Sequence, residues 1–205
     1  MKLFVYDANA VARIYFPDIG TDNLKQIASL PDKAILIPRL AQIESCSAFL
    51  EAVDQGHITQ REYNFVKRRL NSDIARDVLQ VVELDNKQAL KAQELLERHR
   101  PIPGVRRKLK GADSVYLATA VLLADSMKPV DVRVILVTSD MALYQSALSE
   151  PNVEAFHFWT CQCPKCGQID IPTKMKEHQC PNPKCTFACI SCCLANCKSA
   201  YVVGF

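Results

Sequence analysis

The stretch VRVILVTSD, residues 132–140, decides the fold class because it is a strand signal of a particular kind. Its apolar residues follow one another instead of alternating with polar ones, and Asp140 ends the run. Continuous apolar strands are typical of sheets that are buried on both faces, and such sheets are usually parallel. We therefore expect an interior strand of a parallel sheet here, with an acid at its carboxyl end.

Other stretches extend this pattern into an alternation of strands and helices. KLFVYD (2–7), AILIP (34–38), LQVVEL (79–84) and VEAFHF (153–158) are further strand candidates. Helical patterns cover residues 39–54, 59–71, 86–99, 112–127 and 141–148. Thr59 followed by Glu62 predicts a capping box at the start of one of these helices. Strands alternating with helices predict an α/β fold, a three-layer sandwich around a central parallel sheet.

The composition is that of a globular protein. The chain has 205 residues, of which 49% are hydrophobic and 23% charged, enough for one full core and a small appendage. No apolar run is long enough for a membrane span, and the first residues, MKLFVYDANA, contain an acid where a signal peptide would be apolar. We expect a cytoplasmic protein without a membrane partner.

Four acids come from distant segments that should meet at one edge of this sheet. Functional groups gather outside the carboxyl ends of parallel strands, where Asp7 and Asp140 lie. Glu44 falls in the first turns of the helix after AILIP, and Asp113 near the start of the helix opened by Gly111. Taken singly, the aspartates have ordinary roles as turn, capping or helix-dipole residues. Together the four acids predict a site.

Such a cluster favours a divalent cation. Carboxylates held close together cannot all be ionised without a counter-charge, and hard cations with oxygen ligands supply it. We expect Mg²⁺ or Mn²⁺. A metal among carboxylates can generate a hydroxide nucleophile and stabilise the leaving oxygen, which is the chemistry of phosphodiester hydrolysis.

The order of four segments resembles the PIN-domain ribonucleases, the family that includes the VapC toxins. The segments are VYDAN (5–9), IPRLAQIESCSAF (37–49), GADSVYLATA (111–120) and VTSDMAL (137–143), and the resemblance covers about residues 1–157. It implies a PIN-like fold and a metal-dependent endoribonuclease that acts on single-stranded RNA and leaves a 3′-hydroxyl and a 5′-phosphate.

The resemblance also assigns roles to the acids. Asp7, Asp113 and Asp140 would hold the metal, directly or through water, while Glu44 would bridge to a second metal or orient the attacking water. Asn9 and Ser139 lie within two residues of an acid and are weaker candidates for hydrogen bonds that support it.

A basic run precedes Asp113. RHRPIPGVRRKLK, residues 98–110, has six Lys and Arg and no acid. Such a patch can bind the phosphates of RNA, and the candidates are Arg106, Arg107, Lys108 and Lys110. The alternative is a solvated loop that follows a helix end.

The C-terminal part changes composition abruptly. Nine of the ten cysteines lie between Cys161 and Cys197, and CPKCG (163–167) has the form of a zinc knuckle. We expect a nuclease domain at 1–157 and a zinc-binding module at 158–205, whose few aliphatic residues would need metal for stability. The proposed ligands are Cys163, Cys166, Cys180 and Cys185 for one site, and Cys189, Cys192, Cys193 and Cys197 for a second. Cys161 and His178 stay unassigned, and disulfides, an iron–sulfur cluster or a single zinc are alternatives.

A PIN domain with a zinc tail is similar to the endonucleases that mature ribosomal RNA more than to compact toxins. The expected partners are RNA, an antitoxin or a ribosomal protein, and a second copy of the chain, with the zinc module docking substrate or partner. Two other functions stay open, an RNA-binding protein with an idle centre and a zinc-mediated protein-interaction adaptor.

Overall fold

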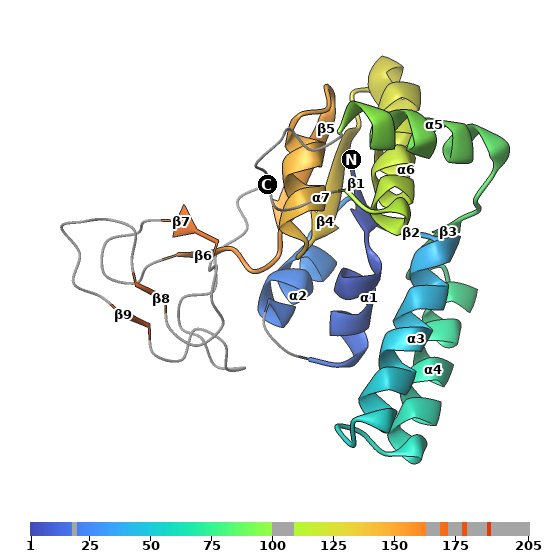
Figure 1. Cartoon of the computed structure of the whole chain (residues 1–205), viewed down its shortest axis with the longest axis vertical. Coiled ribbons are helices and arrows are strands. Elements are labelled where there is room, and N and C mark those ends of the chain that lie inside the picture. Colours follow the sequence, from blue (N-terminus) through green and yellow to red (C-terminus); the bar gives the residue numbers. More distant parts are fainter. Residues whose placement is uncertain (18–19, 100–108, 163–168, 172–177, 180–187, 190–205) are drawn as a thin grey trace.

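The computed structural model describes residues 1–17, 20–99, 109–162, 169–171, 178–179 and 188–189 (Figure 1). The strands of the main body are β1 (Lys2–Tyr6), β2 (Lys33–Pro38), β3 (Gln80–Val82), β4 (Arg133–Thr138) and β5 (Val153–His157). The helices are α1 (Ala8–Tyr15), α2 (Thr21–Ser29), α3 (Arg39–Asp54), α4 (Gln60–Ala75), α5 (Asn86–Arg98), α6 (Gly111–Met127), the 3-10 turn η1 (Lys128–Val130) and α7 (Met141–Leu148). None of the helices in these ranges is long and apolar enough to cross a membrane.

All five strands pair in parallel, in the order β3-β2-β1-β4-β5. The predicted α/β fold with a central parallel sheet is therefore confirmed. The chain runs outward from β1 on one side to β2 and β3, and then returns to β4 and β5 on the other side. The strand order thus reverses between β1 and β4, the position at which open α/β sheets place their sites.

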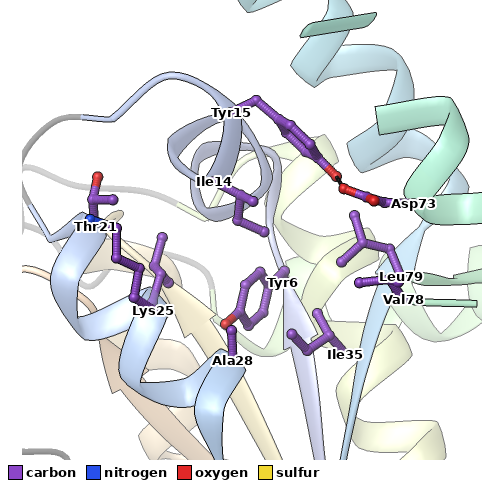
Figure 2. Close-up of a pocket in the computed structure, with 11 residues that line it drawn as sticks. Tyr6, Ile14, Tyr15, Thr21, Lys25, Ala28, Ile35, Asp73, Val78 and Leu79 are labelled. Atoms are coloured by element: carbon purple, nitrogen blue, oxygen red, sulfur yellow. Dashed lines mark hydrogen bonds between the residues drawn. The ribbon is translucent and has the colours of Figure 1, made fainter. Parts of the chain in front are cut away.

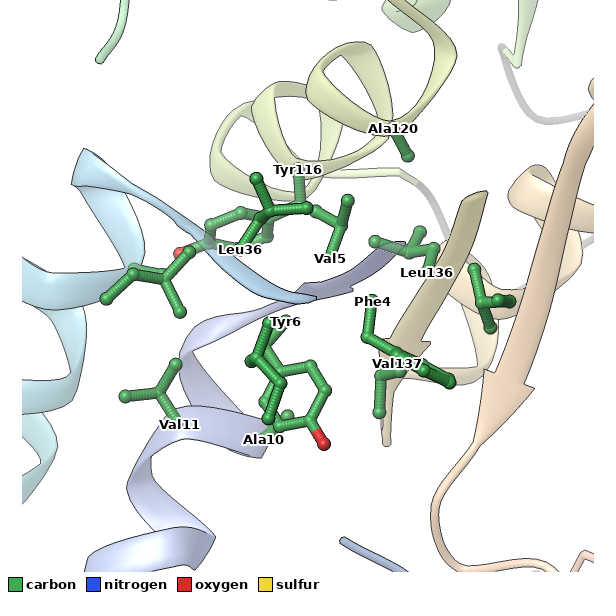
Figure 3. Close-up of a cluster of buried hydrophobic side chains, with 14 of the residues drawn as sticks. Phe4, Val5, Tyr6, Ala10, Val11, Leu36, Tyr116, Ala120, Leu136 and Val137 are labelled. Carbon is green, nitrogen blue, oxygen red and sulfur yellow. The ribbon is translucent and has the colours of Figure 1, made fainter. Parts of the chain in front are cut away.

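The core explains why the strand stretches are continuously apolar. Strands β1, β2 and β4 are buried along almost their whole length, so both of their faces need apolar side chains. Figure 3 shows the two layers: Val5 and Leu136 lie toward Tyr116 of α6, whereas Tyr6 and Val137 lie on the side of Ala10 in α1. Successive side chains of β1 therefore pack against opposite helical layers.

The sequence missed two helices. Residues 8–15 and 21–29 form α1 and α2, which connect β1 to β2. Helix α1 has eight residues and begins at Asp7, whose carboxylate caps it by accepting from the Ala10 amide. The sequence analysis weighed Asp7 as a possible helix cap and as a metal ligand, but assigned no helix to the residues that follow it. The helix expected at 59–71 does begin with the Thr59–Glu62 capping box and extends to Ala75.

A tight junction joins α2 to the end of the sheet. Gly20 has φ 81°, and a Cβ built there would lie 2.4 Å from the carbonyl oxygen of Phe158. The Asn23 amide donates to the carbonyls of Phe158 and Thr160, both at 2.8 Å. Only glycine tolerates both the positive φ and this close approach. The junction fixes the chain as it leaves β5.

Beyond Thr160 the structure describes four short strands. β6 (Cys161–Gln162) pairs antiparallel with β7 (Ile169–Asp170), and β8 (His178–Gln179) pairs antiparallel with β9 (Ala188–Cys189). In backbone register, His178 lies opposite Cys189. The other proposed zinc ligands, Cys163, Cys166, Cys180, Cys185, Cys192, Cys193 and Cys197, lie outside the described residues.

Candidate active site

The site is built around Asp7 at the carboxyl end of β1. Its side chain is only 2% exposed. One carboxylate oxygen accepts from the Ala10 amide at 2.7 Å, and the other accepts from the Thr138 hydroxyl at 2.6 Å. Tyr6 pairs with Val137 in the sheet, so Asp7 and Thr138 come next to each other where β1 and β4 end. The carboxylate is thus fixed from two sides.

Thr138 also connects Asp7 to Asp140. The Thr138 hydroxyl oxygen accepts from the Asp140 amide at 2.9 Å while its proton goes to Asp7. The Asp140 carboxylate caps α7 by accepting from the Ala142 amide at 2.7 Å and the Leu143 amide at 3.0 Å. Both strand-end acids are therefore helix caps as well as members of the cluster.

Glu44 and Asp113 come from helices. Glu44 lies on α3 and accepts a short hydrogen bond from the hydroxyl of Tyr116 on α6. Asp113 lies in the first turn of α6 and accepts from the Lys110 amide at 3.3 Å. Tyr116 is three residues beyond Asp113, so it shares a face of α6 with it and extends this face toward α3.

Electrostatics show that the predicted acids are brought together. Burial, and then repulsion from Asp113 and Asp140, raise the pKa of Asp7 to about 7, even though its two hydrogen bonds act in the opposite direction. Burial, followed by repulsion from Asp140 and Glu44, raises the pKa of Asp113 to about 6. Each of the four acids thus interacts electrostatically with at least one other, and the raised pKa values of Asp7 and Asp113 reflect the cost of ionising them without a counter-charge.

The donor set suits a hard divalent cation. The four acids contribute only carboxylate oxygens, which are the ligands that Mg²⁺ and Mn²⁺ prefer. In the described part of the chain no three His, Cys, Asp or Glu side chains stand close enough to hold one ion by themselves. Mg²⁺ usually keeps several waters and takes only one or two carboxylates directly.

Two residues of the site escaped the sequence analysis. Thr138 and Tyr116 make the hydrogen bonds that position Asp7 and Glu44. Both stand inside the quoted motifs, Thr138 two residues before Asp140 and Tyr116 one helical turn after Asp113. The only sign of their role in the sequence was their short distance along the chain from these two acids. Asn9, by contrast, is exposed and lines a groove between α1 and α3. In the described structure neither Asn9 nor Ser139 has a hydrogen bond to an acid, and their support for the acids stays a prediction.

The basic run, residues 98–110, begins at the end of α5 and stops directly before α6. Arg98 ends α5 and bonds to the buried Glu150 at 2.7 Å, as does His99. Arg98 therefore has a structural role, anchoring the end of α5. Lys110 is exposed directly before α6. Arg106, Arg107 and Lys108 lie outside the described residues.

Comparisons with known proteins address the same region. Among solved structures, FitAcB from Neisseria gonorrhoeae is similar with a TM-score of 0.54 and 15% identity, covering 76% of this chain and 98% of that one. VapBC2 from Rickettsia felis, crystallised with a DNA fragment from its promoter, has a TM-score of 0.45 at 17% identity and covers 75% of this chain and 97% of its own.

A third similar structure is VapC20 from Mycobacterium tuberculosis, described as a Sarcin-Ricin loop cleaving toxin. It has a TM-score of 0.43 at 17% identity and covers 65% of this chain and 86% of its own. No curated protein matched. The likeness to FitAcB supports the fold, since identities this low say nothing finer.

The family model of the PIN domain matches residues 4–147, which include all four acids, Thr138 and Tyr116. The matched segment begins in β1 and ends in α7, so it spans most of the parallel sheet and the edge where the acids meet. The chain belongs to the PIN-domain family.

Proposed function

We propose that the protein is a divalent-metal-dependent endoribonuclease that hydrolyses phosphodiester bonds of single-stranded RNA. The observation that carries the proposal is the mutual repulsion of Asp7, Asp113, Asp140 and Glu44 at the edge where β1 and β4 end. Acids that repel one another cost stability unless a cation or a proton offsets their charge, so the placement of four such acids at one edge argues for a bound cation. Membership of the PIN-domain family supports the nuclease class.

The chain's own groups have separable tasks in this proposal. Asp7 would present a fixed oxygen, because Thr138 and the Ala10 amide leave it no other orientation. Asp113 and Asp140 would bind the waters of the metal or the ion itself. When bound, a divalent cation supplies charge neutralisation at the scissile phosphate and lowers the pKa of a water. Glu44, held by Tyr116, would orient the attacking water with its remaining lone pairs.

Water is the only co-reactant that this hydrolysis needs. The water oxygen forms a bond to phosphorus, and the bond between phosphorus and the 3′ oxygen breaks. One proton of the water passes to solvent, and the leaving 3′ oxygen takes up a proton. The products are a 3′-hydroxyl and a 5′-phosphate. Binding of the RNA backbone by Lys110, with Arg106, Arg107 and Lys108, would place the phosphate near Asp113, directly after this basic run.

The test is cleavage of a mixed RNA pool with and without Mn²⁺, comparing the wild type with Asp113→Asn. The substitution keeps the shape of the side chain and removes its charge, so we expect a loss of about 100- to 1,000-fold. Asp125→Asn on the same helix α6 is the matched control, because Asp125 is exposed and pairs only with Lys128 in the described structure. Equal rates for all three proteins would reject the enzyme and favour an RNA-binding protein with an idle centre.

Acidity offers a second check of the metal. Protonated Asp7 and Asp113 compete with a cation, so activity at low Mn²⁺ should rise with pH between about 6 and 7, near the pKa of Asp113 and Asp7. Raising the Mn²⁺ concentration should shift this rise to lower pH. A pH profile of activity that does not change with the Mn²⁺ concentration would contradict metal binding at these two acids.

The zinc-binding module remains a proposal of its own. It is supported by the cysteine spacing of residues 163–197 and by the domain division near residue 157 that the composition predicts. Protein purified without added metal should carry one or two zinc ions per chain, because thiolates prefer zinc to Mg²⁺. Cys163→Ser should lower the zinc content measured by native mass spectrometry and leave cleavage of short unstructured RNA unchanged. Disulfides without zinc would overturn this part, and the cytoplasmic location with it.

A protein partner would complete the proposal. A groove of about 270 Å³ runs between α1 and α3, with Phe16 on one wall and Ala48 and Ala52 on the other. An antitoxin-like or ribosomal protein with an apolar segment, or a second copy of this chain, suits such a surface. Ala48→Arg should abolish the association in analytical ultracentrifugation, with the unchanged cleavage rate as the control.

A further inference from the structure

Helix α4 carries an aromatic residue, Phe65, on the side that points away from the core. Its side chain is 58% exposed, and among the described residues it is the one exposed aromatic side chain. The opposite side of α4 is buried through Tyr63, Val66 and Leu70. A large aromatic ring stabilises a fold by being buried, so Phe65 adds little to this core. It is therefore a candidate for contact with another molecule.

Three arginines surround Phe65 on the helix surface. Arg61 precedes it by four residues, and Arg68 and Arg69 follow it by three and four. Residues at these spacings are neighbours on an α-helix, and all three arginines are exposed. We call these four residues the Phe65 face. Within the described part of the chain none of its arginines has an ion pair.

The two acids of α4 are bonded elsewhere. Glu62 completes the capping box at the start of the helix. Asp73 accepts from the Tyr15 hydroxyl at 2.9 Å and from Arg76 at 2.6 Å, and Figure 2 shows its carboxylate directed at Tyr15. Neither carboxylate is bonded to an arginine of the Phe65 face.

Exposed cations on other helices are paired. Lys25 bonds to Asp22 on α2 at 3.2 Å, and Lys128 bonds to Asp125 at the end of α6 at 2.9 Å. Pairs three residues apart are the usual arrangement on a solvated helix face. The Phe65 face instead gathers charge of one sign, and such a surface attracts polyanions.

An aromatic ring among arginines matches the two chemical parts of a single-stranded nucleic acid. Guanidinium groups bind phosphates through charge-assisted hydrogen bonds, and an exposed ring stacks on an unpaired base. The bases of a duplex are stacked on one another and do not reach such a ring. An acidic peptide would use the arginines but has no need of the ring.

We propose that the Phe65 face binds single-stranded RNA, with one unpaired base stacked on the ring of Phe65 and the flanking phosphates bound by its three arginines. The choice of RNA rests on the proposed function, whereas the face itself lies on a different helix from all four acids. Binding to this face and cleavage at the acids can therefore be measured separately.

The Phe65 face belongs to a helix that packs beside one of the acid-bearing helices. Helices α3 and α4 run side by side (Figure 1). Burial raises the pKa of the Cys46 thiol on α3, and the charge of Lys67 on α4 opposes this rise, so these two residues lie close together. Cys46 follows Glu44 by two residues. An RNA strand that leaves the acids across α3 would thus meet α4.

The test measures binding by fluorescence anisotropy without divalent metal, so that RNA is bound but not cleaved. The probe is a labelled oligouridylate of about 12 nucleotides, long enough for one binding face. Phe65→Leu keeps an apolar side chain and loses the ring, and we expect it to bind about 5- to 20-fold more weakly. Phe65→Tyr should bind like the wild type. A probe of the same length without bases should bind the wild type and Phe65→Leu equally.

The phosphate contacts are tested by Arg68→Gln. Its matched control is Arg133→Gln at the start of β4, because Arg133 is already paired with Glu154 through two hydrogen bonds. Each phosphate contact with a single strand contributes about 0.7 to the slope of log K against log salt concentration. Arg68→Gln should therefore lower that slope by about 0.7, and Arg133→Gln should leave it unchanged.

Several results would overturn the proposal. Wild-type affinity in Phe65→Leu, or an equal loss for the probe without bases, would reject stacking, and an unchanged salt slope in Arg68→Gln would reject the phosphate contact. If the wild type binds no RNA at low salt, or if Phe65→Leu instead dissociates a dimer of the protein alone, the face does not bind RNA. Unchanged urea unfolding of the variants excludes misfolding. Binding through this face without any cleavage would disprove only the proposed activity.

Discussion

The four acids of the active-site edge fall into two pairs that are held very differently. Asp7 and Asp140, the strand-end pair, follow β1 and β4, and each accepts two hydrogen bonds of 3.0 Å or less. Glu44 and Asp113, the helix pair, are each held by one hydrogen bond, from Tyr116 and from the Lys110 amide. The carboxylates at the strand ends are thus held firmly, whereas the two carboxylates on α3 and α6 are held by fewer hydrogen bonds.

This difference indicates a division of labour. Rigid oxygens suit a metal that demands a defined geometry, whereas a carboxylate held by a single hydrogen bond can change partner when substrate and water arrive. The strand-end pair also caps α1 and α7, so these acids serve the fold as well as the proposed chemistry. Substitutions in each pair can separate the contribution to the fold from the contribution to the proposed chemistry.

The largest effect should be the loss of cleavage in the strand-end pair. Asp7→Asn should lower kcat by at least about 100-fold, because it removes the charge that Thr138 and Ala10 hold in place. Glu44→Gln should cost less, about tenfold, since the amide can still accept from Tyr116 and orient water. Rates are compared on one RNA at saturating Mn²⁺. A larger loss in Glu44→Gln than in Asp7→Asn would reverse the proposed division.

The next effect is on stability without metal. The pKa of Asp7 is raised to about 7 from an ordinary value of 3.8, so the folded state binds more protons than the unfolded state between these values. The free energy of unfolding must then fall as pH rises through about 4 to 7. Asp7→Asn lacks this penalty, and we expect it to gain about 2–4 kcal/mol relative to the wild type between pH 4 and 8.

Urea unfolding in EDTA measures this difference. Asp125→Asn is the matched control, because Asp125 is exposed on α6, pairs with Lys128 in the described structure and is not among the charges that act on Asp7. A constant difference between Asp7→Asn and the wild type across this pH range would show that Asp7 is not strained by burial and repulsion.

A smaller effect should follow from removing the Thr138 hydroxyl. Thr138→Val keeps the shape of the side chain but deprives Asp7 of one donor and the Asp140 amide of its acceptor. We expect a loss of about 1–3 kcal/mol in stability. The pH at which cleavage begins to increase should also be higher than in the wild type, because the ionised form of Asp7 loses a hydrogen-bond donor. Thr119→Val is the control, since that hydroxyl donates to the Val115 carbonyl and accepts from the Gln88 amide of α5, and contacts none of the four acids. Equal pH profiles for the two variants would contradict the positioning role.

The smallest effect concerns the helix pair. Tyr116→Phe removes the hydrogen bond to Glu44 while the ring continues to fill the core between α6 and β1. We expect kcat to fall no more than about tenfold and stability to change by about 1 kcal/mol. Tyr144→Phe on α7 provides the control. A loss as severe as that of Asp7→Asn would show that Glu44 is held as strictly as the strand-end acids.

Much of this architecture could be predicted from the sequence because its signals are local. Continuous apolarity of residues 132–138 identified a buried strand, and Thr59 with Glu62 identified a helix start, since strand burial and capping depend on neighbouring residues. Helices α1 and α2, of eight and nine residues, were not predicted, because Asp7 was weighed as a metal ligand as well as a cap and no helix was assigned to the residues after it.

By itself the sequence determined which residues carry charge at the ends of strands and helices, and hence that Asp7, Glu44, Asp113 and Asp140 belong to one edge. Only the tertiary structure decided how they act on one another. The reversal of strand order between β1 and β4 brings Thr138 to Asp7, and the packing of α6 over the sheet brings Tyr116 to Glu44. The raised pKa of Asp7 likewise arises from burial between layers. Desolvation depends on everything that surrounds a group, and segments far apart in the chain supply those surroundings.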